Sequence, residues 1–384
     1  MKIASVEVLQ VGSEVSGAHT LVRLATDTGI LGIGQSGAWG YPSAVAEIIS
    51  DLRPILLGAD PFRIEHLWNA MVRVRPFRGN LVSAAVSAVD SALWDVKARA
   101  LEVPVFELLG GRSRDKVRLH ALIGGAGPDE LASSVRKALD QGFTAVKFDP
   151  LVSGYEDQPM AKLVGSACAM AAAAREAGGS ELDIIFELHR KLDPAKSVVV
   201  ANELAGFHPL FIEDPIQIDS IEAQAEVCSR IHAPVAIGER LSSLWEYREL
   251  LGHGAPIHVR PDVGLSGGLT GCRKIATLAE SQYCGVIPHN FLGPCLTAAT
   301  LHLCVAIPNL ITMEYATHDE DESSTSAAFS TVLVRRGGYL EVPDTPGMGV
   351  ELVEDHQVVA PVTDPTITMR GLLRHDGSVV GGVA

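Results

Sequence analysis

Three apolar runs of this chain end in glutamate: Ile184-Ile185-Phe186-Glu187, Phe211-Ile212-Glu213 and Val235-Ala236-Ile237-Gly238-Glu239. The three glutamates lie 26 positions apart in both intervals (187, 213 and 239). Short runs of branched apolar residues are typical of strands that are buried on both faces of a parallel sheet. The equal interval indicates that the glutamates occupy equivalent points of successive strand–helix units.

Further apolar runs alternate with helical patterns on both sides of these three. The complete set of predicted strands covers residues 117–123, 145–148, 184–188, 210–213, 235–238, 258–262, 285–289 and 310–314. Eight such units over roughly 200 residues fit a closed (β/α)8 barrel of the TIM type, whose chemistry lies at the C-terminal ends of its strands.

The first 115 residues follow a different pattern. Strand-like runs at 3–11, 20–26 and 30–34 include a turn at Asp27-Thr28-Gly29, and helical spacing follows over 42–57, 64–74 and 82–100. These patterns predict an α+β module. From about residue 338 the chain is rich in Gly, Pro and Val, has no clear βα unit, and is expected to pack back against this module.

The composition argues against several classes of protein. The chain has 384 residues and a formal net charge of -15, whereas nucleic-acid binding requires a surface of lysine and arginine. No apolar run approaches the roughly 18 residues that suggest a membrane span. The six dispersed cysteines form no Cys-x-x-Cys pair, which indicates reduced core thiols. The N-terminus alternates like a strand and lacks a signal-peptide core, so we expect a cytoplasmic protein that binds neither nucleic acid nor membrane.

Ionisable residues stand at the ends of seven of the eight predicted strands. They are Lys147, Asp149, Glu187, His189, Glu213, Glu239, Asp262, His289 and Glu314. The three equally spaced glutamates offer hard anionic oxygens without Cys or His, which predicts a Mg²⁺ site, with Mn²⁺ as a substitute. The alternative is that each glutamate only caps the following helix, and the equal spacing disfavours it.

Longer signatures accompany these strand ends: Ser87-Ala88-Val89-Asp90-Ser91-Ala92-Leu93-Trp94-Asp95, Leu108-Leu109-Gly110-Gly111, Phe211-Ile212-Glu213-Asp214-Pro215, Gly238-Glu239-Arg240 and Arg260-Pro261-Asp262. Together they resemble the enolase superfamily nearly end to end, in its mandelate racemase branch and, within it, the D-galactonate dehydratases. The resemblance implies an α/β fold: a modified (β/α)8 barrel (117–338) with an α+β capping domain (1–116) that the C-terminal segment (339–384) completes. It also implies a homo-oligomer, and capping loops near 15–19 and after Gly40 that cover the barrel mouth.

The same resemblance implies a reaction and its residues. The family's roles fall on Glu187, Glu213 and Glu239 as Mg²⁺ ligands, on His289 with Asp262 as the base and its partner, on His189 as the acid, and on Glu314 as the carboxyl-facing residue. The implied reaction removes the C2 proton of a sugar acid, an aldonate such as D-galactonate or an aldarate, and eliminates the C3 hydroxyl. The product would be a 2-keto-3-deoxy acid.

Elementary chemistry agrees with these roles. A proton next to a carboxylate is too weakly acidic to be removed at neutral pH unless the enediolate is stabilised, which a metal ion does. An imidazole near its ordinary pKa of ~6.5 can remove that proton, and Asp262 at the far nitrogen of His289 would fix the tautomer. The alternative for His289 is a satisfied core histidine. His189 follows Glu187 by two residues, so in a continuing strand both side chains would enter one cavity; the alternative is a loop histidine.

Lys147 and Asp149 depart from the racemase pattern. Racemases of this branch carry Lys-x-Lys and use the second lysine as a base, whereas this chain has Asp149 at that position. A carboxylate beside a cation is a poor base, which disfavours racemisation. We expect both residues to contact substrate, and the alternative for Lys147 is a salt bridge with a metal-ligand glutamate. A second departure is Glu187, where many relatives have Asp.

Three motifs suggest other ligands. The segment 32–37 matches the dinucleotide-binding fingerprint, but the preceding strand returns as a hairpin instead of entering a βαβ unit. The glycine-rich segment 264–268 resembles a phosphate-binding loop but lacks a nearby lysine, so an ordinary turn is favoured. The acidic run 319–322 lacks the spaced ligands of an EF-hand and is expected to be a solvated loop.

Three other functions stay open. A racemase or epimerase of the same branch would need a second base, for which only Lys147 is available. A Schiff-base aldolase would use Lys147 as its nucleophile without a metal. A sugar-acid binding protein that keeps the fold would have lost catalysis.

Overall fold

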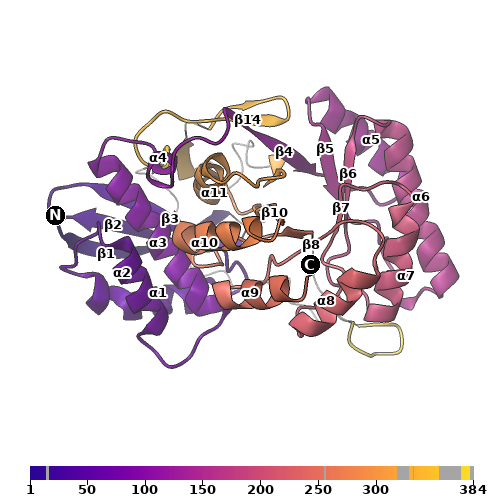
Figure 1. The fold of residues 1–384 in the computed structure, drawn as a ribbon, viewed down its shortest axis with the longest axis horizontal. Coiled ribbons are helices and arrows are strands. Elements are labelled where there is room, and N and C mark those ends of the chain that lie inside the picture. Colours follow the sequence, from indigo (N-terminus) through magenta and orange to yellow (C-terminus); the bar gives the residue numbers. More distant parts are fainter. Residues whose placement is uncertain (14–16, 255–256, 318–327, 332, 354–372, 381–384) are drawn as a thin grey trace.

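The N-terminal module begins with an antiparallel sheet at one end of the molecule (Figure 1). The computed structural model describes residues 1–13, 17–254, 257–317, 328–331, 333–353 and 373–380. The sheet has the order β1-β2-β3, with β1 at Ile3–Ser13, β2 at Gly17–Thr26 and β3 at Leu31–Gln35. These strands confirm the three that the sequence predicted.

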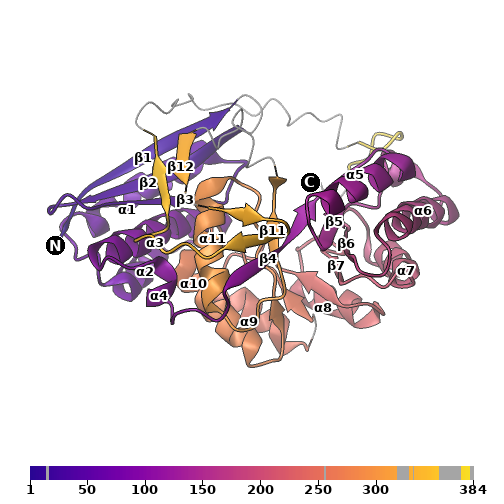
Figure 2. The same ribbon diagram turned by 90° about the horizontal axis from the view of Figure 1, so that it is seen from above.

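Helices pack against one side of this sheet (Figure 2). The helices that contact the sheet are α1 (Pro42–Leu56) and α3 (Asn80–Ala100), whereas α2 (Ile64–Arg73) packs on α1 and α3. The short α4 (Val105–Leu108) leads to the barrel. A Cβ on Gly34 would lie 2.0 Å from the carbonyl oxygen of Ala88, so β3 can rest directly on α3 only with glycine there. Because β3 pairs antiparallel with β2, segment 32–37 does not enter a βαβ unit, and Gly32 and Gly34 lie against α3.

Eight parallel strands form the second module, which confirms the predicted barrel (Figure 1). They are β4 (Lys116–Leu122), β5 (Ala145–Phe148), β6 (Asp183–Glu187), β7 (Phe211–Glu213), β8 (Val235–Ile237), β9 (His258–Val259), β10 (Gly285–Val286) and β11 (Met313–Tyr315). Each pairs with the next up to β10, β11 pairs with β4, and a parallel bridge between Val286 and Leu310 joins β10 to the segment before β11.

A helix follows each of the first seven barrel strands. These helices are α5 (Pro128–Asp140), α6 (Met160–Gly178), α7 (Pro194–Ala205), α8 (Ile221–Arg230), α9 (Leu244–Gly252), α10 (Gly268–Glu280) and α11 (Pro294–Ala306), and the 3-10 helix η1 (Tyr155–Asp157) precedes α6. Among the described residues, no helix follows β11, which is the modification of the regular barrel. The acidic run 319–322 lies outside the described residues.

The C-terminal segment touches both modules. The strands β12 (Phe329–Thr331) and β13 (Arg335–Arg336) precede it, and its own strands are β14 (Tyr339–Glu341) and β15 (Val350–Leu352). Strand β14 pairs antiparallel with β4 of the barrel. Further on, the backbone N–H of Met348 donates to Asp95 at 2.8 Å and Arg99 donates to the carbonyl of Val350 at 3.1 Å, so this part returns to α3. The boundaries at 116/117 and 338/339 stay a prediction.

Side chains of α3 in the capping module hold the start of α10 in the barrel. The backbone N–H groups of Gly267 and Gly268 donate to Ser87 Oγ, both at 2.9 Å. The backbone N–H and the hydroxyl of Thr270 donate to the Asp90 carboxylate at 2.9 and 2.6 Å. The first amides of a helix have no partner within the helix, and here α3 supplies the acceptors. These contacts explain part of the 87–95 signature and occupy the last two amides, those of Gly267 and Gly268, of the glycine-rich segment 264–268.

Replacing Asp90 by Ala should lower the free energy of unfolding by about 1–3 kcal/mol, because two buried donors of Thr270 lose their acceptor. Burial raises the pKa of Asp90 to about 7 despite the Thr270 hydrogen bonds, which marks how fully this carboxyl is removed from water. Urea denaturation would measure the change. The exposed Asp115→Ala should stay within about 0.5 kcal/mol of the parent. Equal stability of Asp90→Ala and the parent would show that this junction contributes nothing.

Candidate active site

A cavity of about 660 Å³ opens at the C-terminal ends of the barrel strands. Its lining includes side chains from both modules, among them Trp39, Asp149, His189, Glu239, His289 and Glu314. The predicted catalytic residues of the barrel therefore border one space, apart from Asp262, which lies behind His289.

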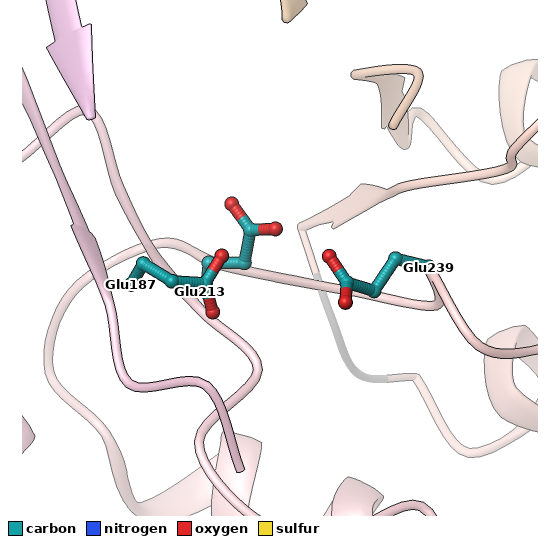
Figure 3. A group of neighbouring side chains, drawn as sticks. All are labelled: Glu187, Glu213 and Glu239. Carbon is teal, nitrogen blue, oxygen red and sulfur yellow. The ribbon is translucent and has the colours of Figure 1, made fainter. Parts of the chain in front are cut away.

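The three equally spaced glutamates converge beside this cavity. Each offers a carboxylate oxygen within 4.8 Å of the others, and all three side chains are buried. Glu187 and Glu213 are direct neighbours in the parallel register of β6 and β7. Glu239 follows β8 after Gly238, whose φ of +125° and close approach to the Tyr247 ring leave no room for a side chain. In Figure 3 the three carboxylates point toward a common space.

Buried cations balance part of the charge on these carboxylates. Lys147 Nζ lies 3.0 Å from Glu187, 3.1 Å from Glu213 and 2.5 Å from Glu314. Lys147 therefore forms the salt bridge with metal-ligand glutamates that was the alternative to a substrate contact. Burial alone would lower the pKa of Lys147, but Glu213 and Glu314 outweigh it and raise that pKa above its ordinary value.

Two arginines complete the shell. Arg260 forms ion pairs with Glu213 and Glu314, the latter at 2.6 Å, and its side chain is fully buried. Arg190 Nη1 lies 2.6 Å from Glu239. Both oxygens of Glu314 are thereby occupied, since Lys147 takes one and Arg260 takes the other. The carboxyl-facing role that the resemblance gave to Glu314 stays a prediction.

The carboxylate cluster fits a divalent cation. Burial raises the pKa of Glu213 well above its usual range, and the neighbouring carboxylate of Glu187 adds to that effect, so the ionised form of Glu213 requires positive charge nearby. Three converging hard oxygens are the donors that divalent cations of the Mg²⁺ class accept. The residues therefore form a candidate divalent-metal site.

His289 and Asp262 form the expected pair. His289 Nδ1 lies 2.6 Å from Asp262 Oδ2, while Asp262 Oδ1 accepts from the backbone N–H of Gly264 at 2.6 Å. The other ring nitrogen, Nε2, lies 3.7 Å from Glu239 Oε2, beside the metal cluster. The strands β9 and β10 are shorter than predicted, but a parallel bridge continues between Asp262 and His289 and brings them together.

His189 lines the cavity from a turn and not from a continuing strand. Strand β6 ends at Glu187, and His189 has a φ of +49°, so the expectation of a continuing strand was wrong. The turn is held by the backbone N–H of His189, which donates to Glu187 at 2.9 Å, and by that of Arg190, which donates to the carbonyl of Asp214 at 2.9 Å. Left-handed backbone is costly for a residue other than glycine and is often found at functional sites.

Some cavity residues were not foreseen from the sequence. Trp39, in the capping module, packs edge-on to Phe291 with ring centroids 6.4 Å apart, and the Arg240 guanidinium lies 5.6 Å from its ring. A tryptophan in a loop without periodicity gives no signal of its own, although the loop after Gly40 was expected near the mouth. Residues 14–16, in the other expected capping loop, lie outside the described residues.

Fold and site together define a capped (β/α)8 barrel with a candidate divalent-metal site and a histidine–aspartate pair at its mouth. Residues 130–356 match the model of the enolase C-terminal domain-like family, and residues 5–110 match the N-terminal domain of mandelate racemase and muconate lactonizing enzyme. The chain belongs to this family within the enolase superfamily.

Similar proteins include dehydratases. The D-galactonate dehydratase of Verminephrobacter eiseniae is 36% identical over 73% of this chain and 74% of its own length. That of Cronobacter sakazakii is 31% identical over 93% and 95%. A crystal structure of an enolase from Agrobacterium radiobacter, suggested to be a galactarate dehydratase and bound to Na and L-malate, has a TM-score of 0.90, 29% identity and full coverage of both chains. These relatives confirm the predicted class, a hydro-lyase.

All six cysteines are free, and five of them are buried, as expected for core thiols. Within the described ranges, no helix has the length and apolar character needed to cross a membrane.

Proposed function

We propose that this chain is a Mg²⁺-dependent dehydratase of a sugar acid, which converts an aldonate such as D-galactonate into a 2-keto-3-deoxy acid. The observation that carries the proposal is the placement of two histidine–aspartate pairs, His289 with Asp262 and His189 with Asp149, beside one buried three-carboxylate cluster. A dehydratase needs this combination because it must both remove a proton and protonate a leaving hydroxyl.

His289 removes the C2 proton. Its Nδ1–H donates to Asp262, so Nε2 is the nitrogen without a proton, and Nε2 lies beside Glu239. Glu187, Glu213 and Glu239 would hold a divalent cation, which would stabilise the negative charge on the carboxylate of the deprotonated substrate. Lys147 and Arg260 hold the carboxylates of Glu213 and Glu314 in place.

His189 protonates the departing hydroxyl. Its ring proton passes to the C3 oxygen as the C3–O bond breaks, and the electron pair left at C2 becomes the C2=C3 bond. Water leaves, and the resulting enol converts to the 2-keto acid. Each atom and charge is accounted for without a further reactant, and His289 keeps the proton taken from C2 until solvent removes it.

An aldarate is the second candidate substrate. Lys191 and Arg240 line the cavity in addition to Lys147, and cationic side chains could hold a second carboxylate. The relative from Agrobacterium radiobacter, which binds the dicarboxylate L-malate, supports this alternative.

A substrate screen tests the proposal. The protein with Mg²⁺ would be incubated with individual aldonates and aldarates, and 2-keto-3-deoxy product would be followed by proton NMR. We expect turnover of D-galactonate or of a close aldonate or aldarate. Inversion at C2 without loss of the C3 hydroxyl would instead identify a racemase or epimerase, and binding without any reaction would identify a sugar-acid binding protein.

Lys147 should form no covalent adduct with substrate. Its ammonium group is enclosed by Glu187, Glu213 and Glu314, and attack on a carbonyl would require the neutral amine to leave all three carboxylates. Borohydride would be added during turnover, and the protein mass would then be measured. A reduced adduct located on Lys147 would move the chain to the aldolases.

A further inference from the structure

We propose, on the basis of the proposed function, that Asp149 is a positioning residue that fixes the ring of His189 so that Nε2 faces the substrate. The acid would thus be oriented by a carboxylate, just as the base His289 is oriented by Asp262. Asp149 then has a role in elimination although it occupies the position where similar racemases carry a second lysine.

The contacts of Asp149 hold its carboxylate toward the protein. Oδ2 lies 3.0 Å from His189 Nδ1 and also forms an ion pair with Lys191, while Oδ1 accepts from the backbone N–H of Leu151 at 2.7 Å. With both oxygens engaged, Asp149 is placed to orient His189 rather than to receive a substrate hydroxyl. Lys191 is itself held on its other side by the Tyr155 ring, whose centroid lies 5.4 Å from Nζ.

The contacts of His189 leave one ring nitrogen for chemistry. Its backbone is fixed by the hydrogen bond to Glu187, and its side chain is about one-third exposed and lines the cavity. Nδ1 is taken by Asp149, and among the described residues none forms a hydrogen bond with Nε2. The Nε2–H bond is therefore the one that breaks when the C3 oxygen receives its proton. After that transfer, the neutral ring retains Nδ1–H on Asp149.

The experiment separates this role from a general structural one. In Asp149→Ala the ring of His189 loses its acceptor, so dehydration should fall at least ~10-fold, and toward the ~10²–10⁴-fold typical of a lost acid. Exchange of the C2 hydrogen with D₂O depends on His289 and should continue in Asp149→Ala, since base catalysis is left in place. Proton NMR of recovered substrate and product reads both. Asp149→Asn, which keeps the shape of the side chain, should show a smaller loss of the same kind.

Two comparisons sharpen the assignment. If Asp149 acts through His189, the double variant Asp149→Ala/His189→Asn should dehydrate no more slowly than His189→Asn alone. The matched control is Asp157→Asn, which breaks another aspartate–histidine pair, with His375, that lies on the surface and outside the cavity lining. This control should leave exchange and dehydration unchanged.

NMR spectroscopy can measure the tautomer of His189, and so its orientation by Asp149, without any turnover. In ¹⁵N-labelled protein, the neutral ring of His189 should carry its proton on Nδ1, and Asp149→Ala should shift it toward Nε2–H; His189→Asn assigns the signals. The proposal is overturned if Asp149→Ala dehydrates at the parent rate, if exchange and dehydration fall together, or if the parent ring lacks Nδ1–H. If the parent shows the Nδ1–H tautomer but acts on no sugar acid, the proposed function is wrong, and Asp149 then has no positioning role in elimination.

Discussion

His289→Asn should abolish both formation of the 2-keto product and exchange of the C2 hydrogen with deuterated solvent. His289 is the group placed with one nitrogen on a buried carboxylate, 2.6 Å from Asp262, and the other beside the metal cluster, 3.7 Å from Glu239. Loss of a general base costs ~10²–10⁴-fold in rate. Proton NMR in D₂O follows both reactions in one sample, and Asp262→Asn should show the same pattern more mildly, since it keeps the imidazole but removes the carboxylate that orients it.

His189→Asn is the matched comparison for His289→Asn. It removes the imidazole of the acid and leaves that of the base, His289, in the same cavity. The C2 proton should therefore still exchange while dehydration is lost. If the His289 variant continued to exchange C2, or if the His189 variant dehydrated at the parent rate, the assignment of base and acid would have to be reversed or abandoned even with an intact metal site.

Chelation of divalent metal should stop turnover, and Glu239→Gln should reproduce that loss with the metal added back. The reason is electrostatic: three buried carboxylates within 4.8 Å of one another cannot stabilise a new negative charge on the substrate without a cation. We expect the turnover rate to fall at least ~10³-fold. The charge stabilisation lost with the metal is several kcal/mol, and each 1.36 kcal/mol of it is worth about tenfold in rate. Activity would be assayed after chelation, after removal of the chelator, and after addition of Mg²⁺ or Mn²⁺ separately.

The control for Glu239→Gln is Glu249→Gln, which makes the same chemical change on the exposed face of α9 in the same βα unit. It should keep full activity and the same metal requirement. Circular dichroism would establish that Glu239→Gln is folded, and calorimetry with Mg²⁺ would show whether its affinity for the ion has fallen. Full turnover in a preparation shown to be free of metal would exclude the metal-assisted mechanism.

The barrel and its metal cluster could be predicted because the relevant pattern repeats along the chain. Parallel strands place equivalent residues side by side, so an interval of 26 positions between Glu187, Glu213 and Glu239 already implied their convergence. The structure has Glu187 and Glu213 as direct partners in register. The pairing of Asp262 with His289 came from the resemblance to the enolase superfamily, and the structure has their side chains 2.6 Å apart, after the neighbouring strands β9 and β10.

Other features depend on contacts between residues that no local pattern connects. The turn at His189 arises from hydrogen bonds to Glu187 and to the next strand, which local alternation cannot reveal. Asp149 and His189 lie 40 positions apart and meet only because β5 and β6 are neighbours.

The largest contribution of the tertiary structure is the join between the two modules. Ser87 and Asp90 could be read as part of a family signature, but their hydrogen bonds to the start of α10, 180 positions further along, appear only after α3 is packed against the barrel. Trp39 likewise becomes a cavity residue only when the capping module is in place. Strand periodicity is a local property that the sequence alone determined, whereas the partner of a single polar or aromatic side chain is decided by the packing of elements far apart in the chain.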